Sequence, residues 1–289
     1  FRPLTILSFA LNRNVLGPEA WSYHAGNVIL HAMVGATLFM LLRAWGIDAS
    51  RAFFAAALFA VHPIHTEVLN MMVGRSELLA GFFLLLALIL AAGTAPWRLW
   101  ASGLCFLLGL LSKEHAITFL ASLLLSDLFF RRNIRQRLPF YTALLALTGC
   151  WLLYRQFGLE YGPVDPFKNS AQINAIYQPL ELLTTPVRIL TALKIQILFL
   201  ARQLLPLNLQ AVYSGQAIAA PVTSLFSGWG IMIWTSIAAL TVLGYYGWRR
   251  HRCFGLAIFL YAVSFSVTAN IFFVSGVLMA ERSAYLPSA

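Results

Sequence analysis

The sequence predicts an all-α polytopic membrane protein, folded as one bundle of transmembrane helices. Two observations carry this prediction. The 289 residues are 60% hydrophobic with a mean hydropathy of +0.77, whereas soluble proteins are about 45–50% apolar. The apolar residues also fall into runs close to the ~20 residues that a helix needs to cross a bilayer. We therefore expect a single transmembrane domain over residues 1–289.

Eight apolar runs separated by short polar connectors are the candidate spans. They cover residues 22–43, 51–63, 74–93, 97–112, 114–130, 138–157, 229–247 and 254–274. The second and fourth runs are short, so their helices should extend into the polar residues beside them. Residues 158–228 then form an extracytoplasmic loop. Within it Asp165, Lys168 and Asn169 could touch a substrate, although an ordinary loop is the simpler interpretation.

A further apolar run, residues 188–206, is polar for a span because it carries Arg188, Lys194, Gln196, Arg202 and Gln203. Basic amphipathic segments lie at the headgroup boundary, so we expect a re-entrant or interfacial helix here. The alternative is a true span, which would move the later connectors to the other side of the membrane.

The formal net charge is +10, from 20 Lys and Arg against 10 Asp and Glu. These basic residues cluster in connectors between spans, which the positive-inside rule explains without any nucleic-acid partner. "RRNIRQR" (131–137) and "WRRHR" (248–252) should face the cytoplasm. Alternating the spans places "HPIHTEVLNMMVGRSE" (62–77), "SKEH" (112–115) and the final "ERSAYLPS" (281–288) on the opposite side.

The connector 62–77 gathers five ionisable residues: His62, His65, Glu67, Arg75 and Glu77. Pro63 disfavours helix at His62, so a span should end there. Glu77 falls in the first turn of the next helix, where the helix dipole favours negative charge. A solvated loop with a capping acid is one interpretation, but ionisable groups at membrane depth usually face a cavity or a partner.

His62, His65 and Glu67 form an H-x-x-H-x-E pattern. Zinc sites use His and Glu ligands, but the helical zinc motif places its histidines at i and i+4. Metal binding by these residues is therefore the minority interpretation.

Three other polar groups interrupt the apolar sequence. Lys113, Glu114 and His115 break two apolar runs, and a lysine suits phosphate, although a turn with a surface ion pair is the alternative. Glu281 and Arg282 follow the last span, where interfacial anchoring by Arg282 and Tyr285 competes with a functional role. His24, Asn27 and His31 share one face of the first span, which favours interhelical hydrogen bonds over substrate contact.

Several sequence segments together resemble the transmembrane O-mannosyltransferases with C-terminal tetratricopeptide repeats, the TMTC family, and their bacterial relatives. They are "FRPLTILSFALN", "YHAGNVILHA", "HPIHTEVLNMMVGRSELLA", "LLSKEHAITFLASLLLSDLFF" and "AERSAYLPS". The resemblance runs in order along nearly the whole chain and is thinnest over 138–230, where "LLPLNLQAVYS" is the best match. It implies a GT-C glycosyltransferase fold. The family's first span, the acidic motif of its first loop and its repeats are not in this sequence, so we expect a fragment.

The resemblance also implies an activity: transfer of mannose from dolichyl-phosphate or another polyisoprenyl-phosphate carrier to a Ser or Thr hydroxyl of an acceptor protein, on the lumenal or periplasmic face. Such an inverting transfer needs a carboxylate to accept the hydroxyl proton and cations to stabilise the leaving phosphate. Glu67 and Glu77, with His65, are the catalytic candidates. The candidates for substrate binding are His62, Arg75, Lys113, Glu114, Arg282 and Arg2. Metal dependence stays open.

On this interpretation the chain is a multi-pass protein of a bacterial plasma membrane or of the endoplasmic reticulum membrane, and its partners are the lipid-linked donor, the acceptor protein and membrane lipids. A multispanning lipid or small-molecule transporter is the alternative, and it predicts charges spread through the membrane depth. A non-catalytic membrane scaffold is a further alternative, in which the acidic clusters would tolerate substitution.

Overall fold

The computed structural model describes residues 2–93, 95–158, 179–207, 209–210, 213, 220–250, 252–272, 274 and 278–289. Every regular element in these residues is a helix, which confirms the predicted all-α class. Asp165, Lys168 and Asn169 lie outside the described residues. The chain divides into two compact units, Phe1–Leu159 with Ser288–Ala289, and Glu160–Pro287; each is described by itself.

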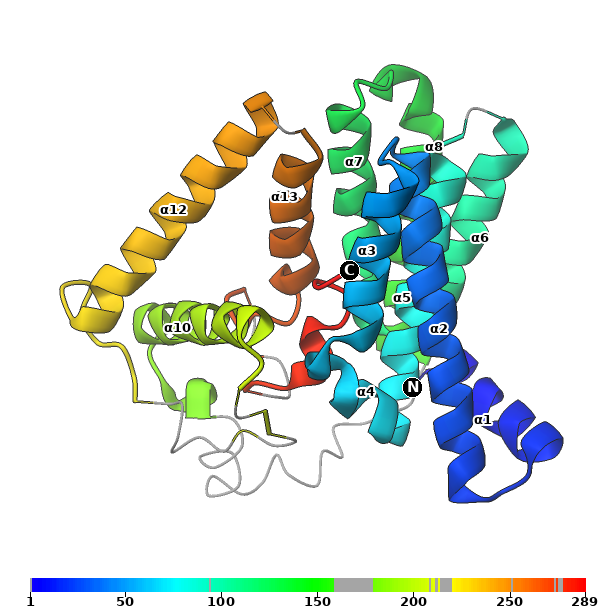
Figure 1. Cartoon of the computed structure of the whole chain (residues 1–289), viewed down its shortest axis with the longest axis horizontal. Coiled ribbons are helices and arrows are strands. Elements are labelled where there is room, and N and C mark those ends of the chain that lie inside the picture. The colour runs from blue at the N-terminus through cyan, green and yellow to red at the C-terminus, as the bar shows by residue number, and fades with distance from the viewer. Residues whose placement is uncertain are drawn as a thin grey trace. The chain divides into compact units, whose positions relative to one another are not determined.

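The first unit is a bundle of helices of mixed length (Figure 1). Its elements in order are α1 (Pro3–Leu16), α2 (Ala20–Ala44), α3 (Ala49–Val61), the 3-10 turn η1 (Pro63–His65), α4 (Thr66–Asn70), the 3-10 turn η2 (Met72–Gly74), α5 (Arg75–Ala91), α6 (Pro96–Ser112), the 3-10 turn η3 (Glu114–Thr118), α7 (Phe119–Phe129), α8 (Ile134–Leu153) and the π-helical turn η4 (Tyr154–Gly158).

Helix α5 forms the core of this unit because it packs against both α2 and α6. A helix that is apolar on all sides is usually buried, and most α5 residues from Leu78 to Ala91 are apolar and buried. Its first turn is different, since Arg75, Ser76 and Glu77 are polar and still buried. The chain therefore places charged groups inside the bundle at the N-terminal end of its central helix.

The antiparallel course of the helices sorts the connectors between two ends of the unit (Figure 1). One end holds the α2–α3, α5–α6 and α7–α8 turns, with the arginine-rich segment 131–137. A buried Asp127 organises that segment, since Arg132 and Arg137 each donate to its Oδ1 at 3.0 Å. The other end holds α1, the segment 62–77 and the segment 113–118. The segments 62–77 and 112–115, which were predicted to lie on the same side of the membrane, thus lie at the same end of the unit.

Three described helical segments are long and apolar enough to cross a membrane: Ala20–Ala44, Met72–Ala91 and Gly228–Arg250. A fourth is added if Ala49–Val61 and Pro63–Asn70, which bend by 49° at a short break, count as one span. Pro63 explains the break, because a proline at that point disfavours continuation of the preceding helix. The chain is therefore a membrane protein, and membrane crossing by the shorter helices stays a prediction.

The second unit contains η5 (Pro179–Leu182), α10 (Thr185–Leu204), α12 (Gly228–Arg250), α13 (Arg252–Ser266) and the 3-10 turn η6 (Glu281–Ala284). Helices α12 and α13 form a hairpin and α10 packs on α12. Within α10, Lys194 is buried, donates to the Ala220 carbonyl at 3.1 Å and lies over the Trp229 ring. An interfacial or re-entrant position for α10 stays a prediction.

Candidate active site

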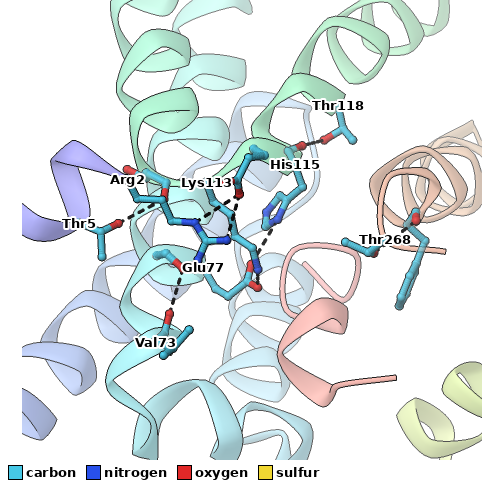
Figure 2. Close-up of polar contacts among 12 residues, drawn as sticks. Arg2, Thr5, Val73, Glu77, Lys113, His115, Thr118 and Thr268 are labelled. Atoms are coloured by element: carbon cyan, nitrogen blue, oxygen red, sulfur yellow. Dashed lines mark hydrogen bonds and ion pairs between the residues drawn. The ribbon is translucent and has the colours of Figure 1, made fainter. Parts of the chain in front are cut away.

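Glu77 lies at the centre of a buried cluster of ionisable groups in the first unit. It sits in the first turn of α5 with only 1% of its side chain exposed. Its Oε1 is paired with Lys113, and its Oε2 lies 3.4 Å from His115 Nδ1 (Figure 2). Lys113 can reach it because extended backbone (φ −157°, ψ 143°) ends α6 at this residue. The buried carboxylate is thus held by two groups from the α6–α7 connection.

His115 is neutral in this setting. Burial lowers its pKa well below the ordinary value, and the charge of Lys113 lowers it further. A neutral imidazole that presents its Nδ1–H to Glu77 leaves Nε2 as an acceptor. Nε2 is buried and makes no hydrogen bond to the residues that the structure describes. The carboxylate and the imidazole together form an arrangement suited to taking up a proton.

Glu114, next to Lys113, binds two guanidinium groups at once. Arg2 donates to its Oε2 from Nε at 3.3 Å and from Nη2 at 3.0 Å, and Arg155 Nη1 lies 2.9 Å from its Oε1. Burial alone would raise the pKa of Glu114, but Arg2, a backbone hydrogen bond and Arg155 lower it to about 2. The carboxylate is therefore ionised at any physiological pH.

Arg2, which binds Glu114, also contacts the residue next to Glu77, so the surroundings of Glu114 and Glu77 form one site. Arg2 Nη1 donates to Ser76 Oγ at 3.3 Å, beside Glu77. The combined site holds three cations against two carboxylates, with Arg2 and Arg155 partly exposed and Glu77 buried. Guanidinium and ammonium groups of this kind bind phosphate. The site therefore combines anion-binding groups that ligands can reach with a protected carboxylate–imidazole pair.

Arg75 lies elsewhere and has a different environment. It is buried, and it donates from Nε to Asn27 Oδ1 and from Nη2 to the Tyr23 carbonyl, both at 2.8 Å. Its guanidinium also lies 4.7 Å from the centre of the Phe9 ring. These contacts tie α5 to α1 and α2, and the predicted substrate-binding role of Arg75 stays a prediction.

The two histidines of the segment 62–77 also lie outside the Glu77 cluster. His62 Nδ1 accepts a hydrogen bond from the Ile64 N–H at 3.2 Å, which caps the turn η1. His65 is buried with its ring centre 4.5 Å from that of Phe59 and 5.4 Å from that of His31. Their predicted catalytic and substrate-binding roles therefore stay predictions.

Glu67 is buried in the short helix α4. Among the described residues, no group of three His, Cys, Asp or Glu side chains is arranged to hold a metal ion. The minority interpretation of His62, His65 and Glu67 as metal ligands stays a prediction. Two residues of the predicted α2 stripe make interhelical hydrogen bonds: Asn27 Nδ2 donates to the Leu69 carbonyl at 3.2 Å, and His31 Nε2 lies 3.0 Å from the Ala60 carbonyl. The third, His24, is exposed.

Glu281 and Arg282 belong to the second unit. Glu281 is buried and accepts hydrogen bonds from the Tyr213 hydroxyl at 2.5 Å and the Gln210 N–H at 2.7 Å. Burial and the hydrogen bond to Glu281 raise the pKa of Tyr213 to about 12. Arg282 is half-buried in η6. A shared site for Arg282 and the Glu77 cluster stays a prediction.

Ser76 and Arg155 were not among the site residues that the sequence predicted. Arg155 carried a signal: it lies in the last turn of the predicted span 138–157, at the end predicted to be extracytoplasmic, where the positive-inside rule makes basic residues scarce. Ser76 carried none, because a serine in a helical first turn is common as a capping residue.

The predicted resemblance to the TMTC proteins is confirmed by comparison with curated proteins. Over 151 residues, which are 48% of this chain and 18% of the relative, the chain is 39% identical to human protein O-mannosyl-transferase TMTC2. It aligns over its whole length with a Caenorhabditis elegans protein O-mannosyl-transferase at 28% identity, and with human protein O-mannosyl-transferase TMTC3 at 27%. It spans 41% and 34% of those two relatives. No family model and no solved structure matches the chain.

Proposed function

We propose that this chain is part of a membrane glycosyltransferase that moves mannose from a polyisoprenyl-phosphate carrier to a protein Ser or Thr hydroxyl on the extracytoplasmic face. The observation that carries the proposal is that the whole of this chain aligns with 41% and 34% of two proteins named protein O-mannosyl-transferases. The all-α membrane bundle is compatible with a GT-C-type enzyme, which is the fold class we propose.

The cluster around Glu77 supplies the groups that this reaction needs. The acceptor oxygen attacks the anomeric carbon, the bond from that carbon to the phosphate oxygen breaks, and the lipid phosphate leaves with the bonding electrons. Lys113 and Arg2 would stabilise the negative charge on the leaving phosphate. Glu77 would accept the hydroxyl proton, directly or through the neutral His115. These roles rest on the proximity of the four side chains (Figure 2).

The test is transfer of radiolabelled mannose from polyprenyl-phosphate mannose to a Ser/Thr-rich protein acceptor by the protein in lipid nanodiscs. Glu77→Gln keeps the size of the side chain but cannot accept the proton, so we expect transfer to fall at least about a hundredfold. Arg135→Gln is the matched control, because Arg135 is exposed in the arginine-rich segment at the other end of the unit. Full transfer by Glu77→Gln would show that Glu77 is not needed for catalysis. If neither the unchanged protein nor any variant transfers any of several sugars, a transporter or a scaffold would be favoured.

A further inference from the structure

Arg155 is a basic residue at an unusual place in the first unit. It lies in η4, directly after α8, at the end of the bundle opposite the arginine-rich segment 131–137. Its side chain is 44% exposed. The proposed roles in transfer do not use it, so its position calls for a separate explanation.

Arg155 and Arg2 meet on the same carboxylate although they are far apart in the chain. Arg2 binds Oε2 of Glu114 and Arg155 binds Oε1. Two like charges brought this close repel each other, and Glu114 compensates only one of them. The pair therefore keeps one excess positive charge, which favours binding of a further anion.

Arg155 also has donors available for such an anion. A guanidinium has five N–H donors in a rigid fork. Among the residues that the structure describes, Arg155 pairs through Nη1 with Glu114, and the face of its guanidinium lies over the Trp151 ring with the central carbon 5.6 Å from the ring centre. The remaining N–H groups lie on a partly exposed side chain, where they can reach a phosphate in the two-point geometry that guanidinium favours.

Exposed apolar side chains surround Arg155 in the sequence. Leu152, Leu153 and Phe157 are 47%, 60% and 76% exposed on the last turn of α8 and on η4. Such an apolar surface beside a cation matches a ligand with a hydrocarbon chain and an anionic head, rather than a free phosphate.

We propose that Arg155, oriented by Glu114 and adjacent to Arg2, binds the phosphate of the polyisoprenyl-phosphate carrier, with the first isoprene units lying on Leu152, Leu153 and Phe157. This inference rests on the proposed function and deepens it. It assigns carrier binding to a residue that contacts Glu114, in addition to the proposed role of Lys113 and Arg2 at the leaving phosphate and of Glu77 as the base.

Binding of sugar-free polyprenyl phosphate to the protein in detergent micelles, followed by native mass spectrometry, tests the inference without any transfer reaction. We expect Arg155→Ala to weaken binding at least about tenfold. Arg155→Lys should keep part of the affinity, since lysine retains the charge but not the fork. Arg135→Ala, which removes an exposed arginine at the other end, should bind as the unchanged protein does.

Two further ligands distinguish binding of the phosphate head group from binding of the hydrocarbon chain. Polyprenol, which lacks the phosphate, should bind weakly and equally to the unchanged protein and to Arg155→Ala, and inorganic phosphate should compete poorly with polyprenyl phosphate. Unchanged binding by Arg155→Ala and Arg155→Lys would overturn this inference and leave the proposed function standing. Failure of the unchanged protein to bind polyprenyl phosphate would overturn both.

Discussion

At the scale of single residues, the pair of Glu77 and Lys113 places two opposite charges inside an apolar bundle. Such a pair is costly to break, because removing one partner leaves an uncompensated buried charge, at about 3–5 kcal/mol, whereas replacing both by neutral groups is often nearly neutral. Function and stability therefore separate at this site, and variants of the two residues can distinguish them.

We expect Lys113→Met to lower the free energy of unfolding by about 3–5 kcal/mol, because Glu77 would stay buried beside His115, a neutral partner. The double variant Glu77→Gln/Lys113→Met should recover most of that loss while mannosyl transfer stays absent. Thermal unfolding in detergent and the transfer assay measure the two quantities. Full stability of Lys113→Met would show that the pair contributes little to the fold, and transfer by the double variant would show that neither charge is needed.

The lowered pKa of Glu114 predicts that the folded protein becomes less stable in acid. Its pKa is about 2 in the folded protein, below the ordinary carboxyl value, because Arg2 and Arg155 favour the charged form. A lowered folded-state pKa stabilises the fold above the unfolded-state pKa and ceases to do so as pH falls toward the folded-state value. We therefore expect part of the acid sensitivity between about pH 5 and pH 2 to come from Glu114.

Thermal unfolding of the unchanged protein and of Glu114→Gln over this pH range tests that expectation. The melting temperature of Glu114→Gln should be lower at neutral pH and should fall less on acidification, so the two curves converge near pH 2. Parallel curves would mean that Glu114 does not bind its two arginines in the folded protein.

At the scale of elements, the turn η2 fits against α4 only because residue 74 lacks a side chain. A Cβ on Gly74 would lie 2.7 Å from the carbonyl carbon of Val68, and closer still to its oxygen. Backbone cannot move aside as a side chain can, so the turn that leads into α5 would have to shift. That turn also sets where Ser76 and Glu77 begin the central helix.

We expect Gly74→Ala to lower the free energy of unfolding by about 1–3 kcal/mol and to reduce transfer, since it displaces the start of α5. Gly149→Ala is the matched control, because no described atom lies within 4 Å of a Cβ at Gly149, toward the C-terminal end of α8. Alanine favours helix over glycine by about 1 kcal/mol, so the control should be neutral or stabilising in the same unfolding measurement. A stable and active Gly74→Ala would mean that η2 can relax without moving Glu77.

Helix positions followed from hydropathy where the apolar runs had clear polar limits. The expected spans 22–43 and 97–112 correspond closely to α2 and α6. The expected start of the fifth span at residue 114 is displaced, because 114–118 form the turn η3 and α7 begins at Phe119. Helix α1 was not expected; its start agrees with the preference of proline for the first helical turn, where Pro3 lies.

The sequence predicted which polar connectors lie on the same side of the membrane, but not which of their side chains contact one another. Arg75 and Glu77 are two residues apart at the start of α5, and a helix turns about 200° over that distance. One side chain therefore enters the α1–α2 contact and the other meets Lys113. Which of the two side chains faces the cluster depends on the rotation of α5 about its own axis. That rotation cannot be predicted from a single sequence.

At the scale of the whole molecule, the first unit has a charge difference between its two ends. The end with the α7–α8 turn carries seven arginines and two aspartates: Arg43, Arg51, Arg98, Arg131, Arg132, Arg135, Arg137, Asp48 and Asp127. The end with the Glu77 cluster carries five cations and four glutamates: Arg2, Arg13, Arg75, Lys113, Arg155, Glu19, Glu67, Glu77 and Glu114. Basic connectors stay on the cytoplasmic side during insertion, so this difference predicts the orientation of the unit.

We therefore expect a cysteine at residue 135 to face the cytoplasm and a cysteine at residue 66 to face the opposite compartment. Thr66 and Arg135 are both exposed, at opposite ends of the unit. Thr66→Cys and Arg135→Cys would be made after the exposed Cys150 and Cys253 are replaced by serine. A membrane-impermeant maleimide added outside sealed vesicles of known orientation should label only one of the two, and detergent should expose the other. Labelling of both from one side would contradict the antiparallel course of the helices across the membrane. Labelling with the sides reversed would place the Glu77 cluster in the cytoplasm, where the proposed extracytoplasmic transfer could not occur.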